Sequence, residues 1–463
     1  MVFSSLIFIF RFMPLFFLCY FLAPKSFRNG ILFLGSIIFY AVGEPVYVFL
    51  MLFSILINFM LCVQMAREKK AGKRKWLLTG ILFFDFGMLF LFKYFDFFAQ
   101  NLNLVLHKEA VPLLNLTLPL GISFYTFQIV SYAADIYYRK MKHTGTLLEF
   151  AAYVSMFPQL IAGPIVQYQE VSNELAARKV TLQAAEQGLE IFCFGLASKV
   201  LLANKIWTLW NQIQGIGYAN LSTPMAWMGA FAYSFHIYFD FWGYSLMAIG
   251  LGKMMGFHLP KNFDSPYMVK SVTEFWRRWH MTLGRFFRQY VYIPLGGNRK
   301  GKLRMLFNML VVWSLTGLWH GASWNFVLWG LGFFVLLTLE KFIYGKFLEK
   351  SRVIGHIYIW IIIPVTWVVF AVTDFSQLVI YLQQLAGIHK QPVMVGTQQL
   401  LRYVKEYSGL FLACAFFSTN LPKRIYYRMR GGLLIVLLAF AVFWYSVYQL
   451  ANGVNNPFAY FRF

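Results

Sequence analysis

Long runs of apolar residues, separated by short basic or polar segments, occupy most of the chain. The runs cover residues 2–23, 31–43, 46–65, 76–99, 113–134, 150–162, 185–204, 224–252, 305–329, 330–345, 356–374, 406–417 and 433–451. A transmembrane helix needs about 20 apolar residues, so the runs at 150–162 and 406–417 are typical of re-entrant or interfacial segments. The pattern predicts an all-α polytopic membrane protein of about eleven transmembrane helices, with one or two re-entrant segments.

The composition agrees with this pattern and excludes two other classes of protein. Of the 463 residues, 59% are hydrophobic and 13% are charged, whereas charged residues make up about 25% of a soluble globular protein. Aromatic residues account for 20% of the chain, which is incompatible with intrinsic disorder. The four cysteines lie in apolar runs without the spacing of metal ligands, so we expect small buried side chains and no metal site.

Basic residues predict which loops face the cytoplasm. The net charge is +23, from 41 Lys and Arg against 18 Asp and Glu, and an excess of bases marks cytoplasmic loops beside anionic lipids. We therefore assign the basic clusters at 67–75, 139–142 and 423–430 to membrane topology rather than to nucleic-acid binding. The weakly charged stretch 100–112 is expected outside. Both the N- and the C-terminus are then predicted to be extracytoplasmic.

A basic segment rich in aromatic residues lies at the centre of the chain. Residues 274–304 read EFWRRWHMTLGRFFRQYVYIPLGGNRKGKLR, with eight bases and no acid after the first residue. On a continuous helix Arg278, Arg285 and Arg288 share one face. We expect residues 253–304 to form a basic amphipathic segment on the cytoplasmic side. The three arginines either bind a phosphorylated ligand or act only as a positive-inside anchor.

His320 is the strongest catalytic candidate. It lies in the apolar sequence GLWHGASWNF without a charged neighbour, and an ionisable residue inside a span is costly and by default functional. Small residues beside it would let a backbone or a ligand approach closely. Trp319 and Trp324 would wall a cavity, and Asn325 would add a polar partner. The alternative is a histidine that only hydrogen-bonds a neighbouring span.

A buried imidazole suits acyl transfer, because a neutral ring with a pKa of about 6.5 can accept a proton from a hydroxyl. The chain has no GxSxG motif and no Ser-His-Asp order, which favours direct transfer from a thioester over a serine acyl-enzyme. His280, inside the basic helix, is a second candidate, with a structural role as the alternative. Asp240 follows His236 by four residues in an apolar run and is a candidate supporting residue of the site, with a structural ion pair or hydrogen bond as the alternative.

Several of these segments resemble the membrane-bound O-acyltransferase (MBOAT) family, most closely its alginate O-acetylation branch and more distantly the teichoic-acid D-alanylation membrane protein. The matching segments are FPQLIAGPI, YFDFWGYSLMAIGLGKMMGF, LPKNFDSPY, TEFWRRWHMTLGRFFRQYVYIPLGGNRKG, GLWHGASWNF and NPFAYFRF. The resemblance implies a single membrane domain over residues 1–463, in a bacterial plasma (inner) membrane, with its helices around a transmembrane tunnel. It implies no tightly bound cofactor.

The resemblance also implies roles for individual residues. The histidine of the WHG motif, His320 in this chain, is the catalytic residue of the family, and His280 of the RRWH motif is its second histidine. The donor, acetyl-CoA, enters from the cytoplasm, and its phosphates fit the face of Arg278, Arg285 and Arg288. An extracytoplasmic acyltransferase partner then completes transfer to a polysaccharide.

Two positions depart from the alginate-type pattern. Leu246 stands where that pattern, Ser-Gly-Tyr-Ser-Asp, ends in an acid, and Gln289 replaces the acid of the usual FRDY sequence. Each change removes a carboxylate near the proposed site.

The C-terminal tail, residues 452–463, is predicted to be extracytoplasmic. The small partner peptide of the D-alanylation system ends in a similar Phe-x-Tyr motif, which makes Tyr460 a candidate acyl carrier. A phenol has a pKa of about 10, so its ester is a better acyl donor than an alkyl ester. The alternative is an aromatic belt at the membrane interface.

Two alternatives to an O-acetyltransferase remain open at this point. One is transfer of a D-alanyl or other acyl group from an acyl-carrier protein to a cell-wall polymer, with the carrier docked on the basic cytoplasmic face. The other is a transporter or lipid flippase. The lack of an internal repeat at a fixed period argues against the second alternative.

Overall fold

The protein is helical wherever the structure describes it. The computed structural model describes residues 1–463 apart from 142, 389–395 and 454–463, and it has no strand within those residues. The predicted all-α class is confirmed. Among the described residues, six helical stretches are long and apolar enough to cross a membrane: Lys25–Gly43, Tyr47–Arg67, Ala71–Leu106, Trp324–Lys350, Arg352–Ala371 and Leu433–Ala451.

These six stretches agree with a polytopic membrane protein, and the count of eleven spans stays a prediction. Large apolar side chains remain exposed on the candidate spans, as Phe83 and Leu433 illustrate. In a membrane protein such side chains face lipid tails, so their exposure carries no cost. Three of the four cysteines are buried as expected, whereas Cys19 is exposed.

The helices fall into two compact units. Unit 1 consists of Met1–Phe192, Ser245–Lys261 and Arg285–Tyr290, and unit 2 consists of Cys193–Tyr244, Asn262–Gly284 and Val291–Phe463. The helices wholly within unit 1 are α1 Met13–Leu22, α2 Arg28–Gly43, α3 Tyr47–Arg67, α4 Ala71–Leu89, α5 Phe95–Leu106, α6 Ile122–Tyr137, α7 Leu147–Ser155, α8 Phe157–Leu160 and α9 Tyr168–Ala176. Those wholly within unit 2 are α11 Asn204–Ile216, α13 Val272–Arg278, α15 Lys302–His320, α16 Trp324–Leu339, α17 Gly345–Lys350, α18 Arg352–Ala371, α19 Phe375–Leu385, α20 Thr397–Ser418, α21 Leu421–Met429 and α22 Leu433–Ala451. Three helices are divided between the units: α10 Leu182–Ala197, α12 Thr223–Met254 and α14 Met281–Phe287.

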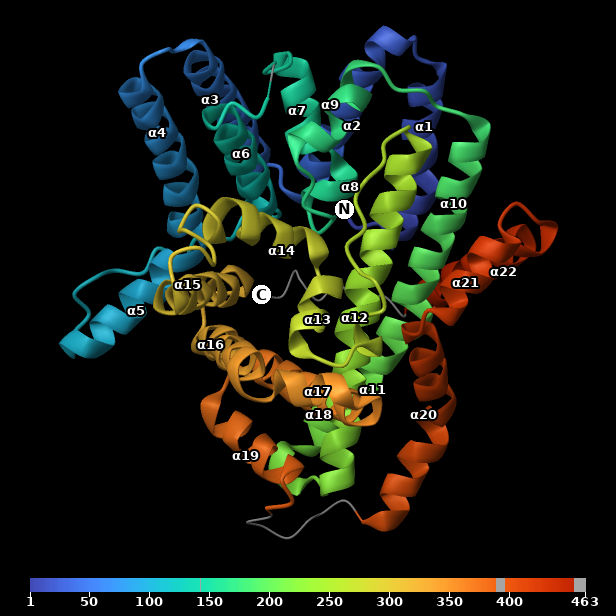
Figure 1. The fold of residues 1–463 in the computed structure, drawn as a ribbon. Helices are drawn as coiled ribbons and strands as arrows, with labels where there is room; N and C mark the ends of the chain where they lie inside the picture. Colours follow the sequence, from blue (N-terminus) through green and yellow to red (C-terminus); the bar gives the residue numbers. More distant parts are fainter. Residues whose placement is uncertain (142, 389–395, 454–463) are drawn as a thin grey trace. The chain divides into compact units, whose positions relative to one another are not determined.

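The core of unit 1 forms around α6. Every residue of this helix from Ile122 to Ile136 is buried, and α3 and α4 pack against it and against each other (Figure 1). Some polar groups in this core have hydrogen-bond partners. Asn58 Nδ2 donates a hydrogen bond to Asp85 Oδ1 at 2.9 Å, and the Arg74 guanidinium donates to the Ile136 carbonyl at 3.0 Å. These bonds offset the cost of removing the polar groups from water.

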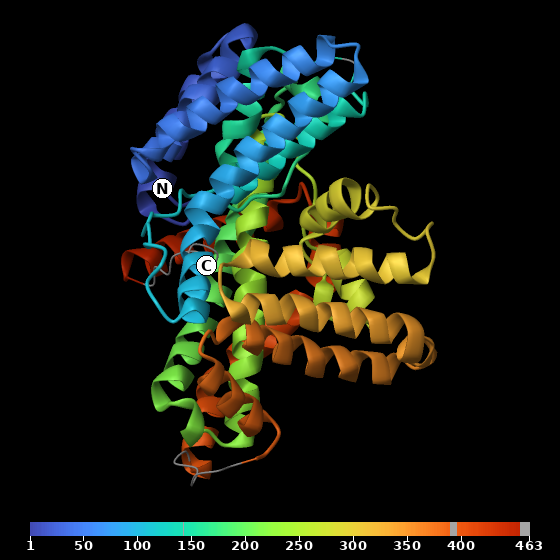
Figure 2. The same ribbon diagram turned by 90° about the vertical axis from the view of Figure 1, so that its left-hand side faces the viewer.

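In unit 2, α15 and α16 form a tightly packed helical hairpin (Figure 2). Glycine makes the close approach possible. A Cβ atom added to Gly317 would lie 2.4 Å from the Phe326 carbonyl oxygen, and one added to Gly330 would lie 2.4 Å from the Trp313 carbonyl oxygen. The predicted close approach of a backbone at the small residues is therefore confirmed. α16 also packs against α13 and α18.

Three predicted apolar runs have different boundaries in the structure. The run 150–162 is split at Met156 between α7 and α8, because Pro158 has no N–H to extend α7 and is tolerated only in the first turn of a new helix. The run 305–329 breaks after α15. The run 406–417, expected to be a short re-entrant or interfacial piece, belongs to the longer helix α20.

Candidate active site

The basic central segment is not one helix. α13 ends at Arg278, His280 has a left-handed backbone with a φ of 44°, and α14 begins at the next residue. The prediction of a continuous helix with Arg278, Arg285 and Arg288 on one face is therefore wrong. His280 lies between two helices rather than inside one.

The cause of the break is a contact with Asn262, which lies before α13 in the sequence. The Asn262 carbonyl oxygen accepts a hydrogen bond from the Met281 N–H at 2.9 Å, and its side-chain Oδ1 accepts one from the Thr282 N–H at 3.2 Å. In a continuous helix these two N–H groups would donate to the carbonyls four residues earlier. One of those carbonyls, that of Arg278, instead accepts from the Asp264 N–H at 3.0 Å.

The imidazole of His280 is enclosed by one amide and two aromatic rings. Its Nδ1 lies 3.2 Å from Asn262 Oδ1, and its ring centroid lies 4.7 Å from that of Phe241 and 5.5 Å from that of Trp319. His280 lies outside the candidate membrane spans, and burial lowers the pKa of its side chain to about 3. The ring is therefore neutral at physiological pH, as a proton acceptor must be.

His320 is the last residue of α15, so it does not lie inside a continuous helix over the apolar run 305–329 as expected. The chain turns at Gly321, where an added Cβ atom would lie 2.3 Å from the Phe326 ring. Any larger residue would disturb this turn. The His320 side chain is buried, and its ring centroid lies 4.8 Å from that of Trp329 and 5.1 Å from that of Phe370.

Trp319 lies against both candidate histidines. Its ring centroid is 5.5 Å from that of His280 and 4.9 Å from that of His320, and its side chain is buried. Unit 2 thus brings together two imidazoles that are well separated in the sequence. Trp324, by contrast, is 50% exposed, and its place in the wall of a cavity stays a prediction.

Asn325 acts on this cluster through a neighbouring residue. It is fully buried, and its Nδ2 donates a hydrogen bond to the Phe370 carbonyl oxygen at 2.9 Å. The bond joins the start of α16 to the end of α18. Because the Phe370 ring contacts His320, Asn325 helps to hold the aromatic wall of the site.

Asp240 has the partner that the sequence requires. Its carboxylate forms an ion pair with the ammonium group of Lys199, and both side chains are buried. His236, one helical turn earlier, lies with Nδ1 3.0 Å from the Ala203 carbonyl oxygen. A charged pair buried among apolar helices is held together because either charge alone would be costly. This geometry favours a structural role for Asp240.

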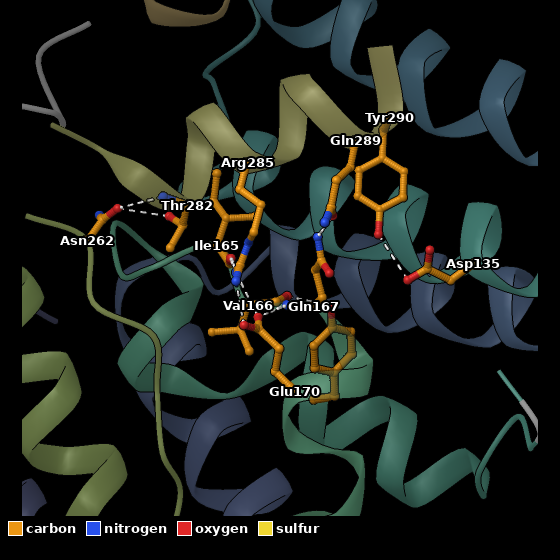
Figure 3. Close-up of polar contacts among 11 residues, drawn as sticks. Asp135, Ile165, Val166, Gln167, Glu170, Asn262, Thr282, Arg285, Gln289 and Tyr290 are labelled. Carbon is orange, nitrogen blue, oxygen red and sulfur yellow. Dashed lines mark hydrogen bonds and ion pairs between the residues drawn. The ribbon is translucent and has the colours of Figure 1, made fainter. Parts of the chain in front are cut away.

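Two of the three candidate donor-binding arginines are paired with acids of this chain. Arg285 forms a bidentate ion pair with Glu170, at 2.6 and 2.8 Å, as Figure 3 shows. Arg278 bonds Glu274, one turn earlier in α13, at 2.6 Å. Arg288 is exposed. Phosphate binding by these arginines stays a prediction, for which Arg288 is the most accessible candidate.

A polar cluster around Tyr290 was not predicted from the sequence. Its hydroxyl donates a hydrogen bond to Asp135 Oδ2 at 2.9 Å (Figure 3), and the same carboxylate forms an ion pair with Lys140 at 3.2 Å. The adjacent Gln289 accepts a hydrogen bond from the Gln167 side chain. The amide that replaces the acid of the usual FRDY sequence therefore still provides an oxygen acceptor at this position.

Two further predictions concern the tail and metal binding. Tyr460 and most of the tail lie outside the described residues. Within the described residues, no group of three or more His, Cys, Asp or Glu side chains is placed to hold a metal ion.

Comparison with known proteins decides the family. Residues 37–383 match the model of the membrane-bound O-acyltransferase family. The chain belongs to this family. It is 32% identical over 505 aligned residues to "Probable alginate O-acetylase AlgI" of Azotobacter vinelandii, and the alignment covers the whole of both chains.

Two other relatives have names that state a different acceptor or a different acyl group. The chain is 35% identical over 430 residues to "Peptidoglycan O-acetyltransferase" of Helicobacter pylori, which covers 84% of this chain and 80% of the relative. It is 29% identical over 233 residues to "Teichoic acid D-alanyltransferase" of Streptococcus thermophilus, which covers 46% of this chain and 54% of the relative. The protein is therefore a membrane O-acyltransferase, as the resemblance implied, and the transporter alternative is no longer needed.

Sequence reasoning missed two residues that organise this O-acyltransferase. Asn262 lies in LPKNFDSPY. The one sequence signal for a role of Asn262 was that this segment is among those that resemble the MBOAT family. Glu170 lies in a polar stretch with no distinguishing pattern. Glu170 is separated in the sequence from its partner Arg285 by more than a hundred residues, and Asn262 is separated from His280 by α13. Local sequence patterns do not reveal such contacts.

Proposed function

We propose that this O-acyltransferase is an O-acetyltransferase that takes an acetyl group from cytoplasmic acetyl-CoA and passes it across the membrane for O-acetylation of an extracellular polysaccharide. The printed names of two relatives support acetyl transfer and a polysaccharide acceptor. The apolar helices support an enzyme that is anchored in the membrane. The acetyl group would cross through a tunnel among about eleven spanning helices.

The observation that carries the proposal is the packing of Trp319 against both His280 and His320. Two buried imidazoles beside one indole provide proton acceptors in a site that excludes water. Burial strengthens the electrostatic interactions that stabilise a developing oxyanion. We assign the catalytic role to His320 and the supporting role to His280.

The proposed chemistry is a direct transfer. The acceptor hydroxyl gives its proton to an imidazole nitrogen while its oxygen attacks the thioester carbonyl carbon. A new C–O bond forms and the C–S bond breaks. The imidazolium then returns the proton to the leaving thiolate. The products are an acetyl ester and free CoA thiol, and the histidine is regenerated.

The donor would approach the basic central segment from the cytoplasm. Guanidinium groups bind phosphate bidentately, and Arg288 is exposed whereas Arg278 and Arg285 are already paired. Binding of CoA phosphates by Arg278 or Arg285 would therefore require their acidic partners to release them. Arg288 needs no such exchange.

On the extracytoplasmic side, a partner acyltransferase would complete transfer to the polysaccharide. Both termini would lie on that side, and Tyr460 of the tail would receive the acyl group and pass it on. If this shuttle operates, the protein acquires label from acetyl-labelled CoA and Tyr460→Phe does not. Acyl transfer to the polysaccharide that survives Tyr460→Phe ends the shuttle and leaves the acetyltransferase in place.

The relationship to D-alanyltransferases favours one other donor, an acyl-carrier protein that bears D-alanine or another acyl group. Membrane vesicles that contain the protein separate the two donors. Thiol release from acetyl-CoA, and none from an acyl-carrier thioester, supports the proposal. The opposite result replaces acetyl-CoA with the carrier.

A further inference from the structure

The side-chain oxygen of Asn262 is the acceptor for two neighbouring groups at the break between α13 and α14. Oδ1 lies 3.2 Å from the Thr282 backbone nitrogen and 2.9 Å from the Thr282 hydroxyl, as Figure 3 shows. The same oxygen lies 3.2 Å from Nδ1 of His280. All three residues belong to unit 2.

These contacts determine how the Asn262 amide is oriented. A backbone N–H can only donate a hydrogen bond, so the atom that faces Thr282 N must be the amide oxygen. Rotating the amide by 180° would place an NH₂ group against another N–H donor. The orientation is therefore fixed by the backbone of Thr282.

The amide orientation in turn fixes the protonation of the imidazole. An amide oxygen only accepts, so Nδ1 of the neutral His280 ring must carry the hydrogen that it donates to Oδ1. Nε2 then holds the free lone pair. With the hydrogen on Nε2 instead, the lone pair of Nδ1 would face the lone pairs of Oδ1. Nε2 is buried and has no hydrogen-bond partner among the described residues.

We propose that Asn262 is a positioning residue that holds His280 as the Nδ1–H tautomer and presents the Nε2 lone pair to a substrate O–H or S–H group. Asn262 also holds the ring in place, because its carbonyl oxygen accepts from the Met281 N–H and stabilises the left-handed backbone of His280. The inference rests on the proposed function for its catalytic consequence. The tautomer itself does not depend on the donor or the acceptor.

Nitrogen-15 NMR tests the tautomer in the full-length protein, solubilised in detergent and labelled with ¹⁵N-histidine. The chain has eight histidines, and the signals that disappear in His280→Gln belong to His280. We expect Nδ1 to give the signal of a protonated nitrogen and Nε2 that of an unprotonated nitrogen. A protonated Nε2 in the wild-type protein overturns the proposal.

Kinetics test the positioning role. Asn262→Leu removes the acceptor, and we expect kcat for thiol release from acetyl-CoA to fall by about 10–100-fold with little change in KM, the loss typical of removing a group that orients a functional histidine. Asn262→Asp keeps an oxygen acceptor at the same position and should recover most of the lost kcat. Asn220→Leu is the matched control, because Asn220 donates to the Ile216 carbonyl and touches no candidate catalytic residue.

The outcomes separate the failure of this inference from the failure of the proposed function. A wild-type protein that releases no thiol from acetyl-CoA contradicts the proposed donor, and the NMR spectrum still reads the tautomer without any donor. If Asn262→Leu keeps the wild-type kcat, the positioning role is refuted. If Asn262→Asp is as inactive as Asn262→Leu although both unfold at the wild-type temperature, the role of the oxygen acceptor is refuted.

Discussion

The indole ring of Trp319 packs against the imidazole of His280, with the two ring centroids 5.5 Å apart. Because His320 follows Trp319 directly and its ring also contacts the indole, one side chain supports both candidate catalytic histidines. The contact joins the end of α15 to the break between α13 and α14. The position of each imidazole therefore depends on the same aromatic wall.

Removing the Trp319 indole should reduce catalytic activity more than it reduces the fraction of folded protein. We expect Trp319→Ala to lower kcat for thiol release by about 100-fold, since small misplacements of reacting groups cost about that much, and Trp319→Phe to keep most of it. Trp210→Ala is the control, because Trp210 is equally buried among tyrosines of unit 2. Equal losses of activity per folded molecule in Trp319→Ala and Trp210→Ala would contradict the role of Trp319.

The buried ion pair of Lys199 and Asp240 should matter for stability. Lys199→Met leaves the Asp240 carboxylate buried without its cation, which costs about 3–5 kcal/mol. The thermal unfolding temperature in detergent should drop, and the double change Lys199→Met with Asp240→Leu should recover much of the loss. A double variant less stable than Lys199→Met alone would show that the acid has a separate stabilising partner.

The arginines of the central segment should divide into two functional classes. Arg285→Gln breaks the bidentate pair with Glu170 and should lower stability by about 1 kcal/mol, the value typical of a partly exposed pair. Arg288→Gln should raise KM for acetyl-CoA without changing the unfolding temperature, because Arg288 is exposed. A normal KM in Arg288→Gln would remove this residue from the donor site.

Protonation of His280 should oppose folding at acidic pH. The pKa of this side chain falls from about 6.5 to about 3 on burial, so the unfolded chain binds one more proton than the folded protein between these values. Stability from this group is fully present above about pH 6.5 and is lost as the pH falls towards 3, by at most about 1.4 kcal/mol per pH unit.

Comparison with His280→Gln isolates this contribution, because all other groups titrate in both proteins. The difference in unfolding temperature between the wild-type protein and the variant should be constant above about pH 7.5. At lower pH the unfolding temperature of the wild-type protein should fall relative to that of the variant. A constant difference over the whole range would mean that the ring is not desolvated in the folded state.

The sequence predicted the helical class and the two histidines because these depend on local patterns. Apolar runs correspond to helices such as α3 and α22, whose lengths follow from the runs themselves. The histidine motifs combine residue types that remain recognisable without any structure. The motifs alone do not show that the rings of both histidines contact Trp319, which only the structure reveals.

The sequence failed where distant contacts end a helix. Nothing in the residues around His280 indicates a break, because the break is made by hydrogen bonds that the Met281 and Thr282 N–H groups donate to Asn262. The end of α15 at His320 depends likewise on the Phe326 ring, which fills the space beside Gly321. In both cases the tertiary contact overrides the apolar or amphipathic pattern, and the predicted helix is too long.

The central claim is that His320 promotes acyl transfer from a thioester in a site that it shares with His280. The most direct measurement is thiol release from acetyl-CoA by the purified protein with a soluble hydroxyl acceptor, compared with His320→Ala and His280→Gln. We predict release by the wild-type protein, none by His320→Ala, and a strongly reduced rate for His280→Gln, with all three proteins folded. Wild-type rates of release by a folded His320→Ala protein would contradict the account.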